Sequence, residues 1–118
     1  MTKKELEERL IQFAVKVIKF CQQMPNTREG NYLAGQMLRS GCSGALNFGE
    51  AEDAESTNDL IHKNKIILKE LRETNMALRI CFLSDCSPDK EENKWLINES
   101  DELTAIFVSS NKKLRLKN

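Results

Sequence analysis

Apolar residues recur along the first part of the chain at alternating steps of four and three. The positions are Leu6, Leu10, Phe13, Val17, Phe20 and Met24. This spacing places them on one side of an α-helix of about five turns. Thr2 and Glu5 have the S/T-x-x-E form of a helix start, and Pro25 disfavours helical geometry at the residue before it. The pattern therefore predicts a helix over about residues 3–24.

Three further segments have an apolar stripe, and each follows a capping signal. Asn26, three residues before Glu29, predicts a helix over about 27–55, and Ser56 predicts one over about 57–84. Ser87 as N-cap, with Pro88 as the first helical residue, predicts a helix over about 88–115. The core positions expected in these helices are Leu33 or Ala34, Met37 or Leu38, Gly41, Ala45 and Phe48; Leu60, Ile67, Leu71, Leu78 and Phe82; and Trp95, Leu96, Leu103, Ile106, Phe107 and Leu114.

Short connections between these segments predict the topology. A connection of a few residues cannot reach the far end of the preceding helix, so sequential helices must be antiparallel neighbours. We therefore expect an all-α fold, an antiparallel up-and-down four-helix bundle. Gly41, Gly44 and Gly49 each cost the second helix up to ~1 kcal/mol relative to alanine. Close approach of another helix at these glycines would explain them.

Length and net charge limit the number of domains and the kinds of partner that the chain can have. A chain of 118 residues with 40% hydrophobic residues is expected to form one domain over residues 1–118. Eighteen Lys and Arg balance eighteen Asp and Glu, so a nucleic acid or anionic membrane would have to be held by a local patch. The chain start has no apolar leader and no apolar run is long enough to span a bilayer, so we expect a cytoplasmic protein with no membrane partner.

Candidate catalytic and metal-binding chemistry is sparse. Asp59 and His62 have the spacing of half a bundle di-metal site, but His62 is the only histidine, so the second half cannot be built. A nucleophilic triad would need the same histidine. The four cysteines contain no C-x-x-C pair and are expected to be reduced, packed thiols: Cys21, Cys42, Cys81 and Cys86. We predict a protein that is not an enzyme, with no catalytic residues, no metal and no cofactor.

The outward face of the third predicted helix changes character along its length. His62, Lys65, Lys69 and Arg72 follow one another at helical spacing and lead into Met76, Ile80 and Leu83. The apolar end favours a subunit interface, because a solvated face does not need it. The basic end, together with the basic C-terminus, favours contact with RNA or DNA phosphates. A charged, solvated face compensated by Glu70 and Glu73 is the alternative.

The second and third predicted helices carry motifs of a bacterial family. Residues 36–43 (Q-M-L-R-S-G-C-S), with Asn47 and Glu50-Ala51, and residues 59–63 (D-L-I-H-K) and 68–74 (L-K-E-L-R-E-T) are similar to its recurrent segments. The chain resembles the 23S rRNA intervening-sequence proteins, which include the accessory variability protein of diversity-generating retroelements. The resemblance implies an antiparallel four-helix bundle that assembles into a ring, typically a pentamer, and no enzyme. Its retroelement members are strongly basic and work with reverse transcriptase and RNA.

Several polar residues of this chain match recurrent polar positions of that family. A charge-paired network is expected among Arg39, Ser40, Asn47, Glu50, Glu70, Arg72 and Glu73. In it, Arg39 or Arg72 would pair with Glu50, Glu70 or Glu73 and fix register and assembly. The resulting hypothesis is a non-enzymatic homo-oligomeric assembly or scaffold protein. The alternative is an RNA- or DNA-binding accessory protein that uses the basic face of the third helix.

Overall fold

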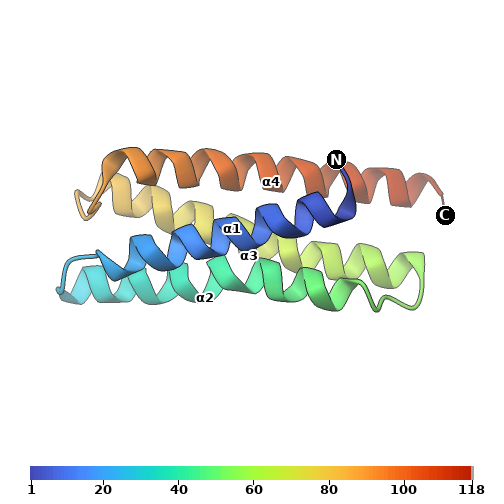
Figure 1. The fold of residues 1–118 in the computed structure, drawn as a ribbon, viewed down its shortest axis with the longest axis horizontal. Helices are drawn as coiled ribbons and strands as arrows, with labels where there is room; N and C mark the ends of the chain where they lie inside the picture. The colour runs from blue at the N-terminus through green and yellow to red at the C-terminus, as the bar shows by residue number, and fades with distance from the viewer. Residues whose placement is uncertain (118) are drawn as a thin grey trace.

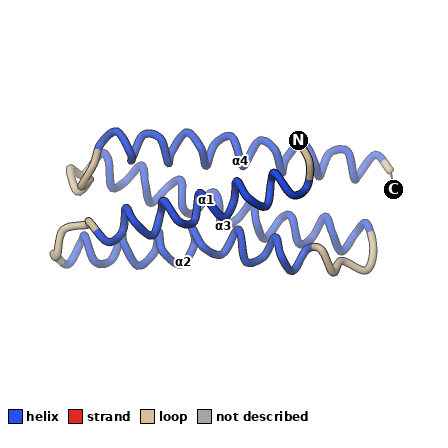
Figure 2. Tube along the Cα trace, in the orientation of Figure 1, coloured by secondary structure: helices blue, strands red, loops and turns tan. Residues whose placement is uncertain are grey.

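The chain folds into four long antiparallel helices joined by short loops (Figures 1 and 2). The computed structural model describes residues 1–117. The helices are α1 (Lys3–Gln22), α2 (Arg28–Ala51), α3 (Thr57–Leu83) and α4 (Lys90–Leu116). Within residues 1–117, α1 packs against α2 and α4, and α3 packs against the same two helices. The backbones of diagonal helices lie farther apart, and core side chains meet between them, as where the rings of Phe48 of α2 and Phe107 of α4 pack edge to face with centroids 6.0 Å apart. The predicted all-α four-helix bundle is confirmed, with extents of 48 × 20 × 20 Å.

Two of the predicted helix starts are confirmed and two are wrong. The Thr2 and Ser56 hydroxyls accept hydrogen bonds from backbone N–H groups three residues later, at 3.1 and 3.0 Å. The second helix is capped by Thr27 and not Asn26, whose side chain accepts a hydrogen bond from Asn31 instead. The fourth helix is capped by Asp89, so neither Ser87 nor Pro88 begins it. A carboxylate is well suited to this position because the helix dipole favours negative charge there.

The observed helix ends also differ from the predicted ones. The first helix ends at Gln22, two residues before the predicted end, because the residue before Pro25 is disfavoured in helical geometry. The second ends at Ala51 and not near 55. There the Glu55 N–H donates to the Asp59 carboxylate, which recruits residue 55 into the cap of α3. Apolar periodicity alone does not show whether a residue between two helices extends the first helix or caps the second.

The core is formed by the predicted stripes, with several corrections. Its buried members include Leu10, Phe13, Val17, Phe20, Leu33, Met37, Phe48, Ile67, Leu71, Leu78, Leu96, Leu103 and Phe107. Of the paired alternatives, Leu33 and Met37 face inward, whereas Leu38 is exposed. The core prediction for Trp95 is wrong, because its ring lies at the surface with the Lys16 ammonium 4.6 Å from the ring centroid. Residues predicted in the core but only partly buried are Ala45, Leu60, Phe82, Ile106 and Leu114.

Glycines on α2 divide into one that the packing requires and others that it does not. A Cβ atom added to Gly41 would lie 2.8 Å from Cγ1 of Val17, so α1 and α2 approach closely there. At Gly44 the nearest atoms would be 3.9 Å away, and at Gly49 nothing lies within 4 Å. The close-approach explanation therefore holds for Gly41 and is wrong for Gly49.

Membrane-spanning helices are absent from residues 1–117. None of the four helices combines the length and the hydropathy that crossing a bilayer needs.

Candidate functional site

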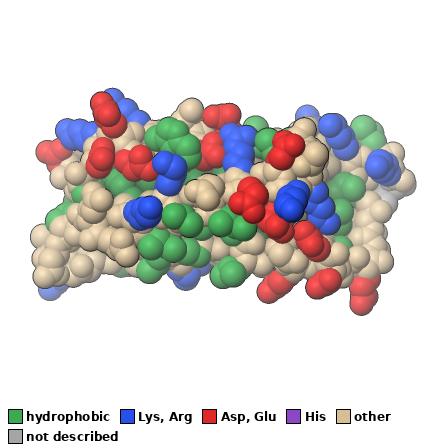
Figure 3. Space-filling model, viewed as in Figure 1, with side chains coloured by type: hydrophobic (Ala, Val, Ile, Leu, Met, Phe, Trp, Pro, Cys, Tyr) green, Lys and Arg blue, Asp and Glu red, His purple; other side chains and the backbone are tan. Residues whose placement is uncertain are grey.

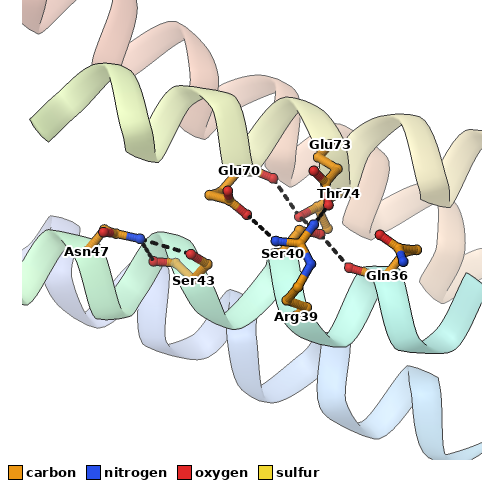
Figure 4. Close-up of polar contacts among 8 residues, drawn as sticks. All are labelled: Gln36, Arg39, Ser40, Ser43, Asn47, Glu70, Glu73 and Thr74. Atoms are coloured by element: carbon orange, nitrogen blue, oxygen red, sulfur yellow. Dashed lines mark hydrogen bonds and ion pairs between the residues drawn. The ribbon is translucent and has the colours of Figure 1, made fainter. Parts of the chain in front are cut away.

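A polar network joins α2 and α3 near the middle of the bundle (Figure 4). The Arg39 guanidinium forms an ion pair with Glu70, at 3.1 Å, and a second with Glu73. Beside it the buried Thr74 hydroxyl lies 2.8 Å from the Ser40 hydroxyl and 2.8 Å from the Glu70 backbone carbonyl. Figure 4 shows Arg39 extending from α2 toward the two carboxylates of α3. The structure thus brings together Arg39, Ser40, Glu70 and Glu73 of the predicted set.

The other predicted members of the network lie elsewhere. Asn47 donates to the Ser43 carbonyl and hydroxyl of its own helix, at 2.8 and 2.9 Å. The exposed Glu50 carboxylate has no ion-pair partner within residues 1–117, although its backbone carbonyl accepts from Lys63 at 3.4 Å. Arg72 lines the groove between α3 and α4. It follows Glu70 by two residues, which is a rotation of about 200° about the α3 axis, so it points away from the side of α3 that meets Arg39. The predicted pairing of Arg72 with Glu50, Glu70 or Glu73 is therefore wrong.

Two further polar contacts were not predicted. The Arg9 guanidinium of α1 binds both oxygens of the buried Glu99 carboxylate of α4, at 2.8 and 2.7 Å, and Glu102 at 3.2 Å. The hydrogen bonds that Arg9 donates to the Glu99 carboxylate raise the pKa of Arg9 above its usual value. The buried Asn64 side chain donates to Asn111 at 3.0 Å. Sequence separations of 90 and 47 residues explain why no local pattern indicated these pairs.

A basic groove lies between α3 and α4. It encloses about 410 Å³ and is lined by Lys65, Leu68, Lys69, Arg72, Val108, Asn111 and Arg115. None of its four cationic side chains forms an ion pair within residues 1–117. His62 is exposed on the outer side of α3 but does not line the groove. The predicted basic residues other than His62 therefore meet Arg115 of the basic C-terminus in one groove, which can receive a phosphate-bearing ligand.

Two apolar surfaces are exposed, of which only one was predicted. The first, here called the α3 ridge, is Met76, Ile80 and Leu83, with exposed fractions of 56%, 52% and 80%. The second lies on the outward side of α2, where Tyr32, Leu38 and Leu46 are exposed. Figure 3 shows apolar side chains gathered over the middle of α1 and α2. The sequence signal for this second surface is the segment Gly30–Gly49, whose only charged residue is Arg39.

An open groove of about 770 Å³ lies at the end of the bundle where α4 extends beyond the start of α1 (Figure 1). Its apolar lining includes Leu6, Phe48, Leu60 and Phe107. Within residues 1–117 no three His, Cys, Asp or Glu side chains are grouped to hold a metal ion.

Three of the four thiols, those of Cys21, Cys42 and Cys81, are poorly suited to nucleophilic chemistry. All four are free, and burial raises the pKa of Cys21 and of Cys81 to about 11. Burial also raises the pKa of Cys42. A raised pKa keeps a thiol protonated, whereas reactive cysteines have a lowered one.

Comparisons with known proteins agree with this fold. A family model described as 23S rRNA-intervening sequence protein matches residues 3–109. A crystal structure of a protein of unknown function from the S23 ribosomal protein family of Bacteroides thetaiotaomicron is 29% identical, with a TM-score of 0.85 over 95% of this chain and 99% of that one. No curated protein matches the chain. The chain belongs to the 23S rRNA-intervening sequence protein family.

Proposed function

We propose that this chain is a non-enzymatic assembly protein whose copies associate through exposed apolar faces to form a scaffold. The observation that carries the proposal is the outward side of α2. From Gly30 to Gly49 the helix has a single charge, on Arg39, and that charge is already paired with Glu70 and Glu73 of α3. A stretch of helix with one charge, already ion-paired, in a chain that is 31% charged is suited to contact with protein.

The energetics of the exposed side chains support association. Leu46 and Leu83 are 70% and 80% exposed. Full burial of a leucine side chain contributes roughly 1.5–3 kcal/mol, so several such residues in one contact offset a substantial part of the cost of association. The resemblance to ring-forming relatives supports a closed homo-oligomer, for which a pentamer is the expected size. Four free thiols support a reducing compartment, and we place the protein in the cytoplasm.

Light scattering coupled to size-exclusion chromatography tests the proposal. We expect a mass several times the 13.5 kDa of one chain at micromolar concentration. Ile80→Glu should lower that mass, because it places a charge in the α3 ridge. Ala105→Glu, an equivalent change at an exposed position of α4, is the matched control and should leave the mass unchanged. A wild-type monomer throughout this range would contradict the proposal.

Binding of RNA or DNA in the basic groove is a second candidate function. Four cationic side chains without ion-pair partners in the described chain favour it: Lys65, Lys69, Arg72 and Arg115. The sequence resemblance to retroelement accessory proteins, which work with RNA, supports the same candidate.

Fluorescence anisotropy with labelled RNA and DNA at two salt concentrations tests this second candidate. Binding that weakens as salt rises, and that Arg115→Glu abolishes, is the expected result. Lys94→Glu on the outward side of α4 is the control for loss of positive charge. No measurable binding at low salt would remove this candidate.

A further inference from the structure

We infer that this chain binds one monovalent copper ion through sulfur atoms at the end of the bundle that lies away from both chain termini (Figure 1). The ligands are the thiolates of Cys81 and Cys86 and the thioether of Met24. None of these three residues belongs to the exposed apolar surfaces proposed for assembly, so the two proposals can be tested separately.

Two sulfur atoms from different helices already meet at this end of the bundle. The Cys81 thiol of α3 lies 3.7 Å from the sulfur of Met24, which follows the end of α1. Three ligands in a triangle around one metal ion, at the distance of about 2.3 Å known for zinc thiolates, lie about 4 Å from one another. Cys81 and Met24 therefore have nearly the spacing that a shared ion needs.

The C-cap of α3 brings a third sulfur atom to the same place. Asp85 has a left-handed backbone, with φ of 63°, and the Cys86 N–H donates to the Cys81 carbonyl at 3.1 Å. This combination is typical of a Schellman motif, in which the residues at the two ends of the turn pack against one another. Cys86 packs against the core. Burial raises the pKa of the Cys81 thiol most, and the nearby Cys86 thiol raises it further.

The side chain of Asn93, near the start of α4, is an independent indication of a ligand here. It is fully buried, and within residues 1–117 neither its amide nitrogen nor its oxygen has a hydrogen-bond partner. Buried amides are rarely left unpaired without a reason. Asn93 lies beside Cys81 and lowers the pKa of that thiol, against the larger effect of burial. Its N–H is thus placed to donate to a Cys81 thiolate, as outer residues of metal sites do for the ligands.

The donor set selects the metal. Thiolate and thioether sulfur are soft ligands, which suit monovalent copper. Structural zinc needs four ligands, and within residues 1–117 no three His, Cys, Asp or Glu side chains are grouped to hold an ion. On binding, the S–H bonds of Cys81 and Cys86 break, two copper–sulfur bonds form and two protons pass to water. The Met24 sulfur adds a lone pair, and the oxidation state of copper does not change.

Anaerobic titration of the reduced protein with Cu(I), in competition with a chromogenic Cu(I) chelator, tests the site. We expect wild type to withdraw one ion per chain. Cys81→Ser and Cys86→Ser should each lower the affinity more than about 100-fold, which exceeds the effect typical of an outer residue. Met24→Leu keeps an apolar side chain of similar size but removes the sulfur, and should also weaken binding. Cys42→Ser, at a free and half-buried thiol of α2, is the matched control and should not.

Asn93→Leu tests the positioning role of the amide. It should lower the affinity for Cu(I) about 10-fold, because the Cys81 thiolate loses a donor. The thermal midpoint of the metal-free protein should not fall, since the change removes unpaired buried polar atoms. A loss of metal-free stability with unchanged affinity would show that Asn93 has only a structural role.

Three results would overturn the copper site. One is a wild-type protein that withdraws no Cu(I) from the chelator. Another is Cys42→Ser losing as much affinity as Cys81→Ser, because copper would then bind to thiols without a defined site. The third is an X-ray absorption spectrum of the copper-loaded protein with nitrogen or oxygen ligands in place of sulfur. If circular dichroism shows that Cys81→Ser does not fold, the half-buried positions Met24 and Cys86 supply the test.

Discussion

Helices α2 and α4 occupy diagonal corners of the same bundle, yet their outward sides differ. Both pack against α1 and α3 within the described chain. The outward residues of α4 are mostly charged or polar and include Lys94, Asn98, Asp101, Glu102 and Lys112. The outward residues of α2 include Tyr32, Gly35, Leu38, Leu46 and Gly49, all exposed. The fold requires only an inward stripe, so the bundle itself does not account for the difference. The polar outward side of α4 suits contact with water, and the outward side of α2 is the one we propose for contact with a second copy.

The largest effect is expected from a matched pair of glycine substitutions that separates the two sides of α2. Gly41→Ala places a Cβ atom 2.8 Å from Val17, a branched side chain in the closely packed core. It should lower the free energy of unfolding by about 2 kcal/mol. Gly49→Ala meets nothing within 4 Å and should raise that free energy by about 0.5–1 kcal/mol through helix propensity. Urea unfolding measures both, and equal effects would show that the two sides of α2 are packed alike.

The second prediction concerns the ion pair between Arg9 of α1 and Glu99 of α4. Arg9→Met removes the guanidinium that binds both oxygens of Glu99, a carboxylate only 8% exposed. We expect a loss of about 2 kcal/mol, below the cost for a fully buried pair because the Arg9 side chain is 27% exposed.

The double variant Arg9→Met with Glu99→Gln is the control for that ion pair. It should recover part of the loss, because no unpaired buried carboxylate remains. If the double variant is less stable than wild type by the sum of the losses in Arg9→Met and in Glu99→Gln, the two residues are not coupled and the ion pair is not what holds α4 against α1.

The fold was more predictable from the sequence than the surfaces were. Periodicity located all four helices, because each stripe is set by residues three and four apart. The contact of Arg39 with Glu70 was also predicted, since it joins neighbouring antiparallel helices. The pair of Arg9 and Glu99 was not, because it depends on how the first and last helices close the bundle. The exposed apolar surface on the outward side of α2 was missed because the small residues of this helix look like a packed interior, and only the exposure of Leu38 and Leu46 reveals a second face.

The next prediction concerns how stability changes at alkaline pH, where two buried thiols titrate, one packed against α2 and the other against α4. The Cys21 thiol donates to the Ala34 carbonyl of α2 at 3.5 Å, and Cys81 is buried beside Asn93 of α4. In the folded chain burial raises the pKa of both thiols from 9.0 to about 11. The unfolded chain therefore releases these protons first as pH rises, so the contribution of the two thiols to stability should be constant below about pH 9 and fall between pH 9 and 11.

The expected loss is about 1–2 kcal/mol for the fully buried Cys81 and less for the half-buried Cys21. Unfolding of Cys81→Ala across the same range should show a smaller decrease than wild type. An undiminished decrease in that variant would mean that other groups titrate with unfolding.

The smallest effect is expected on the intrinsic stability of a single chain, and it separates the outward sides of α2 and α4. Leu46→Lys and Ala105→Lys each place a lysine at an exposed helix position, so neither should change the stability of the dilute monomer by more than about 0.5 kcal/mol. The dependence of the thermal midpoint on protein concentration distinguishes the two variants. If α2 contacts a second copy, the thermal midpoints of wild type and Ala105→Lys should rise with protein concentration, because association stabilises the folded chain. Leu46→Lys should lose that rise, since the lysine would have to enter the contact. A midpoint that depends equally on concentration in all three proteins would show that the uncharged side of α2 faces water just as α4 does.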